Sequence, residues 1–140
     1  MTRLIDKLRP EYRLGLAQMD ETHMEFIDIV NAIGQVRGAE FSTLYRRLVE
    51  HTEIHFSQEE ALMEETGFPA WREHHEEHVR VLKDMQLLLR MMERGSAGMA
   101  RAFIMQTLPE WFDLHAKTMD AALATHCLRN KSKPRLQMAY

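Results

Sequence analysis

The chain contains one cysteine, Cys127, among its 140 residues. A single thiol cannot form a disulfide within the chain, and it cannot build a zinc or iron–sulfur site that depends on several cysteines. The sequence also lacks any apolar run near the roughly 18 residues that a membrane span requires, and its N-terminus shows no signal-peptide pattern. These absences favour a soluble, cytoplasmic protein with no membrane partner, in which histidine is the available soft metal ligand.

Positive charge is not in excess either. The formal net charge is -3, so the sequence gives no basic surface with which to bind nucleic acid. The one basic stretch without acidic residues is the tail, residues 129–140, which we expect to be a solvated terminus rather than a docking segment. No low-complexity segment divides the chain, and its length fits a single domain over residues 1–140.

Strand signals are missing as well, since no stretch alternates apolar and polar residues and no hairpin dipeptide occurs. Four segments instead carry apolar residues at helical spacing. We predict a first helix capped by Asp20 and ending at Gly38, and a second from about Phe41 to the Gly67-Phe68-Pro69 turn. A third would open at Pro69 or Ala70 and run to Gly95.

The fourth predicted helix starts at a Ser96 cap and contains Pro109, so it either kinks there or begins there after a separate turn. The fold class predicted is all-α, an antiparallel up-down-up-down four-helix bundle over residues 20–128. An irregular N-terminal arm over residues 1–19 precedes it. We expect this arm to pack on the bundle through Leu4, Leu8, Tyr12 and Leu14.

Histidine recurs on the inward stripes of all four helices. The stretch from His51 to His78 holds a His and a carboxylate four residues apart, a turn, and two further histidines four residues apart, so each pair lies on one helix face. A buried imidazole without a partner costs roughly 1–3 kcal/mol, so several on converging faces indicate a metal site. A nitrogen-and-carboxylate donor set suits iron better than magnesium or calcium. The candidate ligands are His23, His55, Glu59, His74, His78, His115 and Asp120.

Other histidines have simpler interpretations. His51 lies one turn before His55, and we expect it not to be a ligand. His75 is predicted on the solvated face, and His126 and Cys127 lie beyond the ligand level. No Glu is followed by His three residues later, which disfavours the ferritin-like di-iron class. Residues 74–78 match the His-x-x-Glu-His pattern of one metalloprotease class, but such enzymes need a larger fold.

The order and spacing of these residues resemble the hemerythrins, in particular the bacterial single-domain hemerythrins. The resemblance spans residues 19–120 and rests on four motifs: Met19-Asp20-Glu21-Thr22-His23, His55-Phe56-Ser57-Gln58-Glu59-Glu60, Gly67-Phe68-Pro69 followed by His74 and His78, and Trp111 with His115 and Asp120.

The resemblance implies two non-haem iron ions, bridged by carboxylates and by an oxo or hydroxo group. It implies that His74, His78 and His115 hold one iron, that His23 and His55 hold the other, and that Glu59 and Asp120 bridge them. In that family the open coordination position lies on the iron with two histidines, where dioxygen binds. Helical offsets suggest an apolar lining for this position, from Phe26, Ile27, Phe56, Leu62 and Met119.

One spacing departs from a regular helix. His115 and Asp120 are five residues apart, about 140° around an ideal helix, and would point to different sides. The family shares this spacing. Either the helix widens locally near the site or Asp120 reaches in from the flank.

The function that the resemblance implies is reversible dioxygen binding by an oxygen carrier, storage or sensing protein, and not an enzyme. The alternative is a di-iron enzyme that acts on peroxide, nitric oxide or a small oxidisable substrate. We prefer the carrier because no spare acid, tyrosine or thiol is evident in the ligand stripes to deliver protons. Dioxygen is the one partner that the sequence suggests, and it identifies no protein partner.

Overall fold

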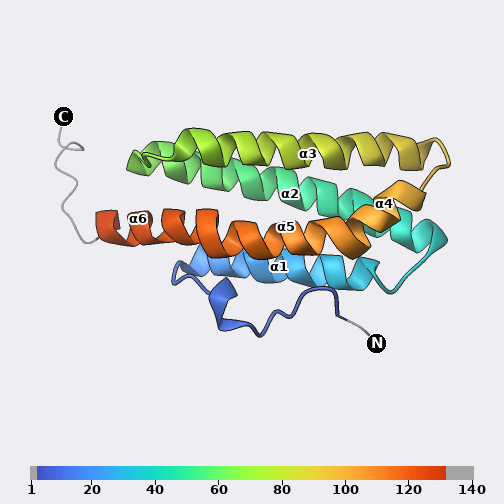
Figure 1. The fold of residues 1–140 in the computed structure, drawn as a ribbon, viewed down its shortest axis with the longest axis horizontal. Helices are drawn as coiled ribbons and strands as arrows, with labels where there is room; N and C mark the ends of the chain where they lie inside the picture. Colours follow the sequence, from blue (N-terminus) through green and yellow to red (C-terminus); the bar gives the residue numbers. More distant parts are fainter. Residues whose placement is uncertain (1–2, 132–140) are drawn as a thin grey trace.

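Four long helical stretches pack side by side and antiparallel in the computed structural model, which describes residues 3–131 (Figure 1). The first three are α1 (Ala17–Ile33), α2 (Gly38–Thr66) and α3 (Trp71–Glu93). The fourth is continuous but consists of five segments: α4 (Gly98–Ala102), η2 (Phe103–Thr107), α5 (Leu108–His115), η3 (Ala116–Asp120) and α6 (Ala121–Lys131). This architecture confirms the predicted all-α up-down-up-down bundle. No helix among the described residues is both long and apolar enough to span a membrane.

The turn between α2 and α3 forms as the sequence predicts. Gly67 adopts a left-handed conformation, with φ 63° and ψ 45°. This conformation costs little free energy for glycine, because it has no Cβ. The Phe68 N–H then donates to the carbonyl of Met63 at 3.0 Å, which gives a carbonyl of the last helical turn a hydrogen-bond partner. Phe68 is buried beneath the turn. This tight reversal brings the last turns of α2 against the first turns of α3.

The start of α1 differs from the prediction that Asp20 caps it. The helix begins at Ala17, and the Asp20 carboxylate accepts hydrogen bonds from the backbone N–H groups of Leu14 at 2.7 Å and Gly15 at 3.1 Å. Asp20 therefore fixes the arm to the first turn of the helix. Two further boundaries also differ, because α1 ends at Ile33 and Gly38 opens α2, and because the fourth helix starts at Gly98 with no cap from Ser96.

The N-terminal arm runs along the outside of the bundle beside α1 (Figure 1). The Asn31 side chain accepts from the N–H groups of Leu4 and Ile5 and donates to the Ile5 carbonyl, at 2.8–2.9 Å. Further along the arm, the short helix η1 (Pro10–Tyr12) buries Tyr12, whose hydroxyl donates to Asp113 at 2.6 Å. Leu8, which we expected to pack on the bundle, is 70% exposed. Ile5 takes that role instead.

The fourth helix does not begin at Pro109, because its helical segments run on from Gly98 through that residue. The π-helical segment η2 ends two residues before Pro109, and the Leu108 N–H donates to the Phe103 carbonyl five residues back. Proline has no N–H to give to the regular ladder, and a widened turn makes room for its ring. A second π-helical segment, η3, follows His115 and ends at Asp120. The local widening that we considered at this spacing is therefore present.

Apolar residues form two clusters with the candidate ligands between them. The larger cluster fills the bundle towards the α1–α2 and α3–α4 connections, and includes Ile33, Leu48 and Met85. The smaller cluster lies at the other end, around Met63 and Leu123. The histidine-rich layer is thus enclosed by apolar packing on both sides, which lowers the local dielectric and strengthens charge interactions within it.

Candidate metal centre

All seven candidate ligands are buried, and each of the four helices contributes at least one. The most exposed of them are His55 and His115, at 5%. A buried polar set of this size must be satisfied by partners within the protein or by a bound ion. The helices place these residues as follows: His23 on α1, His55 and Glu59 on α2, His74 and His78 on α3, His115 at the end of α5 and Asp120 at the end of η3.

Within the described residues the donor atoms fall into two groups, each with all its members within 4.8 Å of one another. One group contains three histidines and the other contains two. Glu59 and Asp120 belong to both groups. The full membership is Glu59, His74, His78, His115 and Asp120 for the first, and His23, His55, Glu59 and Asp120 for the second.

Glu59 divides its two oxygens between the groups. Its Oε1 lies 3.1 Å from Nε2 of His74 and 3.1 Å from Nε2 of His78. Its Oε2 lies 2.6 Å from Nε2 of His55 and 3.8 Å from Nε2 of His23. A carboxylate that bridges two cations presents one oxygen to each in this way.

Asp120 repeats the pattern from the opposite helix. Its Oδ1 lies 3.1 Å from Nε2 of His74 and 3.2 Å from Nε2 of His115, and its Oδ2 lies 2.9 Å from Nε2 of His23. The widened turn of η3 is what allows this, because it brings a residue five positions after His115 back to the same face of the helix.

Many of these short distances are not hydrogen bonds. Nε2 of His23, His78 and His115 and both oxygens of Asp120 are buried and have no partner in hydrogen-bonding geometry. Neighbouring ligands of a six-coordinate metal with bonds of about 2.1 Å lie about 3 Å apart, with their lone pairs aimed at the metal rather than at each other. The spacing of 2.9–3.2 Å around Asp120 fits that arrangement. The donor set therefore fits metal ions.

The electrostatics also favour cations. Burial alone would raise the pKa of Glu59, but His55, His23 and His74 beside it hold that pKa well below its usual range. Burial likewise lowers the pKa of His23, yet Asp120 and Glu59 outweigh it and raise the pKa to about 10. Two ionised carboxylates in an apolar layer attract positive charge, which metal ions or bound protons can supply.

Aromatic rings wall the three-histidine group. The Phe56 ring stacks on His78 with centroids 3.9 Å apart and planes 6° apart, and the Trp111 ring stacks on His115 at 4.5 Å. The Trp111 indole N–H donates to Glu77 at 2.6 Å, which fixes the ring in place. These rings fix the two imidazoles and cover them from solvent.

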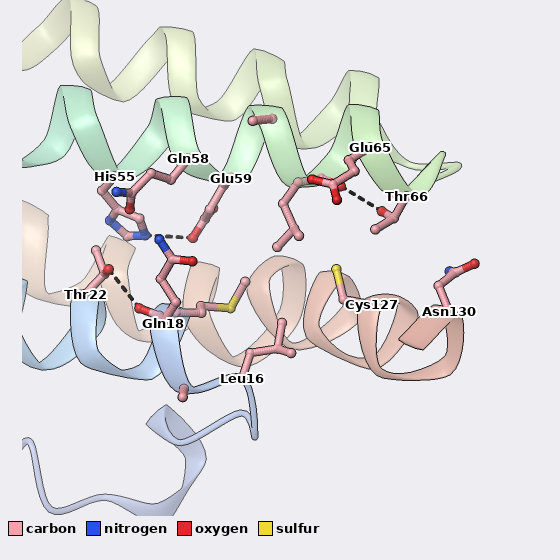
Figure 2. Close-up of a pocket in the computed structure, with 14 residues that line it drawn as sticks. Leu16, Gln18, Thr22, His55, Gln58, Glu59, Glu65, Thr66, Cys127 and Asn130 are labelled. Atoms are coloured by element: carbon pink, nitrogen blue, oxygen red, sulfur yellow. Dashed lines mark hydrogen bonds and ion pairs between the residues drawn. The ribbon is translucent and has the colours of Figure 1, made fainter. Parts of the chain in front are cut away.

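A cavity of about 670 Å³ reaches the two-histidine group instead (Figure 2). It is lined by the N-terminal end of α1, the second half of α2 and the end of α6, and His55 and Glu59 are the candidate ligands among its lining residues. Of the five residues proposed for an apolar pocket, Leu62 lines this cavity. Phe26, Ile27 and Phe56 are buried in the larger apolar cluster, and Met119 is half-buried.

The sequence reasoning missed the polar part of this lining. Gln18, Gln58 and Glu65 line the cavity, and Cys127 lies at the far end from His55 (Figure 2). An acid and a thiol outside the ligand stripes therefore share a cavity with two candidate ligands. The signal available was weak, since Gln18 and Gln58 are separated by 40 residues and meet only when α1 and α2 pack together.

The remaining histidines make contacts outside the donor groups. His51 is half-buried and lies 3.4 Å from Glu25. His75 is partly exposed, and its Nδ1 donates to Glu60. The same Glu60 accepts a hydrogen bond from Nδ1 of His78 at 2.9 Å. Glu60 thus orients a candidate ligand from behind, a role that the sequence reasoning did not assign.

Comparisons with known proteins agree with this geometry. The family described as the hemerythrin HHE cation binding domain matches residues 14–127. A bacteriohemerythrin from Ralstonia nicotianae is 34% identical over 112 residues, which cover 80% of this chain and 81% of that relative. No solved structure gives a significant match. The matched segment contains all seven buried donors, and the chain belongs to the hemerythrin family.

Proposed function

We propose that the protein binds dioxygen reversibly at a centre of two iron ions. The observation that carries the proposal is that two buried carboxylates each divide their oxygens between a three-histidine group and a two-histidine group. Five imidazole nitrogens suit iron better than the oxygen-preferring cations. The similarity to a bacteriohemerythrin also supports the proposal of an oxygen-binding iron centre. The proposed ligands are His74, His78 and His115 for one iron, His23 and His55 for the other, and Glu59 and Asp120 for both.

The two groups are unequal, and this inequality sets where dioxygen would bind. Two six-coordinate ions need about twelve donor positions, and the histidine nitrogens and carboxylate oxygens supply about nine. An oxo or hydroxo group shared by both ions would fill about two more, one on each, and would leave about one position open. The group of His23 and His55 has one histidine fewer, so an open position falls there. The cavity reaches that group through His55. When bound, the iron pair would supply the electrons that hold dioxygen.

The chain's own residues would protect this position. Phe112 packs edge-on against His23 with centroids 5.5 Å apart, and Phe56 and Trp111 cover the other iron's histidines. Exclusion of water from the buried layer slows the proton-assisted loss of electrons from a bound oxygen molecule. The cavity beside His55 is then the route by which dioxygen arrives and leaves.

Reduced protein should take up dioxygen reversibly. We expect purified, anaerobically reduced protein to develop a visible absorption band on exposure to air and to lose it under vacuum, with about two irons per chain in the same sample. Optical spectra with iron quantified on that sample measure this. Metal analysis that returned no iron would refute the centre itself.

One observation about the cavity lining favours a second candidate function, that of a di-iron enzyme. Glu65 and Cys127 line the cavity that reaches His55, so an acid and a thiol share the space that leads to the proposed open position. A di-iron enzyme that acts on peroxide, nitric oxide or a small oxidisable substrate would use such groups for proton or electron transfer. Irreversible bleaching in air, together with steady turnover of peroxide, would favour the enzyme over the carrier.

Dioxygen is the one partner that we propose. We also propose a cytoplasmic location, because the chain has a single cysteine, which is buried and suits a reducing compartment. The net charge of -3 gives no support for nucleic-acid binding.

Glu60 should tune how tightly the centre holds metal. Its carboxylate accepts from Nδ1 of His78 at 2.9 Å, which fixes the ring with Nε2 towards the centre. Loss of such a partner typically weakens metal binding about 10- to 100-fold. We expect Glu60→Ala to speed the loss of metal to a chelator by a factor in that range, with Glu60→Gln in between.

Glu64 provides the matched control for this experiment. It lies one turn further along the same helix, is exposed, and does not line either donor group. Glu64→Ala should therefore leave the rate of metal loss unchanged. Equal rates for Glu60→Ala and the unmodified protein would show that His78 is held by packing against Phe56 alone.

A further inference from the structure

The cavity beside His55 is much larger than dioxygen requires. Its volume is about 670 Å³, whereas a water molecule, which is similar in size to dioxygen, occupies about 30 Å³ in the liquid. Sites for organic molecules usually measure about 300–1,000 Å³. A gas channel alone does not account for this space.

The lining of the cavity has two kinds of surface. Leu16, Met19 and Leu62 give it an apolar wall, and Leu16 and Met19 are themselves buried in the smaller apolar cluster. Gln18 and Gln58 lie at the end nearest His55 (Figure 2). No hydrogen bond within the described residues occupies either side-chain amide, so both can donate to and accept from a ligand.

Other polar groups on the wall already have partners. The Thr22 hydroxyl donates to the carbonyl of Gln18, and the Thr66 hydroxyl donates to the carbonyl of Leu62 at 2.8 Å (Figure 2). The Asn130 amide donates to the carbonyl of His126. Hydrogen bonding to a ligand therefore falls mainly to the two glutamines beside His55.

The charges of the lining select against anions. Among the residues that the structure describes, no lysine or arginine lines the cavity, whereas Glu59 and Glu65 both do. An anionic ligand bound against this wall would lose hydration without gaining a cationic side chain as partner, which is costly at a partly desolvated site. A neutral molecule meets no such cost.

We propose that this cavity binds a neutral amphipathic organic molecule that carries an alcohol or phenol group. Its apolar body packs against Leu16, Met19 and Leu62, and its hydroxyl bonds to the amides of Gln18 and Gln58 next to His55. This site lies beside the proposed oxygen-binding position, and side chains of the protein rather than the metal make its contacts. An occupant would lie across the route from solvent to His55.

Calorimetric titration of the purified full-length protein tests the proposal with two matched probes. 4-Butylphenol is neutral and has both the apolar body and the hydroxyl, and 4-butylbenzoate adds a negative charge to the same framework. We expect the phenol to bind one site per chain and the benzoate to bind at least about tenfold more weakly. Absence of phenol binding, or equal binding of the benzoate, would overturn the proposal.

Variants place the binding within the cavity. Leu62→Trp fills the apolar wall and should reduce binding of the phenol at least about tenfold. Ile54→Trp puts the same ring on the same helix at a position that is 60% exposed and outside this cavity, and should leave binding unchanged. Unaltered binding by Leu62→Trp would place the phenol elsewhere and refute the assignment.

Ala61→Phe gives a second, independent check if Leu62→Trp fails to fold. Ala61 lines the cavity and is exposed, so a larger side chain there narrows the opening without crowding the core. It should also weaken binding of the phenol, and unchanged binding would count against the site. Because these measurements require no oxygen chemistry, binding can succeed while the air-exposure spectrum fails, or the reverse.

Discussion

His74→Ala is expected to remove the metal centre and to lower the melting temperature by at least about 10 °C. Nε2 of His74 lies 3.1 Å from Glu59 and 3.1 Å from Asp120, so this residue contacts both proposed bridges. Structural metal sites contribute several kcal/mol to folding, and for a domain near this size each kcal/mol corresponds to roughly 2–4 °C. Iron per chain and thermal unfolding monitored by circular dichroism measure the two effects.

His75→Ala is the matched control, because it removes the same side chain from the next position of the same helix. His75 is partly exposed and contacts Glu60 rather than the donor groups. We expect it to retain iron and to melt within about 2 °C of the unmodified protein, as surface substitutions usually do. If His74→Ala keeps its full iron content, the proposed ligand set is wrong. The difference in melting temperature between His74→Ala and the unmodified protein should shrink when both are stripped of metal. Without metal, the variant lacks only the packing contacts of the imidazole ring.

Much of the fold follows from local chemistry. The four apolar stripes predict the helices, and Gly67 ends α2 where the sequence places the turn, because a left-handed residue and a proline shortly after it stop a helix. Helix boundaries were less predictable where one side chain has two possible hydrogen-bond partners. Asp20 can cap a helix or bind the N–H groups of an arm, and only the packed arm decides between them.

The ligand layer was predictable for a related reason. His74 and His78 lie on one helix face at regular spacing, and the structure brings them together with the donors from the other helices. The spacing of His115 and Asp120 was ambiguous, because five residues fit one face only if the helix widens. The structure shows that widening in η3, which no local propensity of residues 116–120 indicates.

The cavity could not have been predicted from helical offsets. It lies where the ends of three helices meet, and its lining comes from residues far apart in the chain, such as Gln18, Leu62 and Cys127. Helical offsets suggested Phe26 and Ile27 for an apolar lining, and both are buried in the larger cluster, outside this cavity. A periodic pattern identifies which face of a helix points inward. It does not show whether side chains of the other helices fill the space beside that face.

Phe112→Ala is expected to lower the free energy of unfolding by about 3–5 kcal/mol. The ring is 2% exposed and connects its own helix to the arm and to α1. Its centroid lies 5.1 Å from that of Tyr12 in the arm, 5.5 Å from that of His23 and 5.0 Å from that of Phe26. Removing it leaves a cavity beside a proposed ligand and takes away the surface on which the arm packs. Denaturant unfolding at equilibrium measures the loss.

Phe103→Ala separates this effect from the general cost of losing a phenylalanine in the same helix. Phe103 is only half-buried and lies at the edge of the larger cluster, so we expect less than half the loss seen for Phe112→Ala. Phe112→Leu should recover part of the stability, because it refills most of the volume. Iron content gives a further distinction. In Phe112→Ala, His23 loses its packing partner, while the rings over His78 and His115 stay in place. The metal at His23 should therefore be lost first, which gives close to one iron per chain. A variant that kept both irons and unfolded like Phe103→Ala would show that the arm and the centre are held independently of this ring.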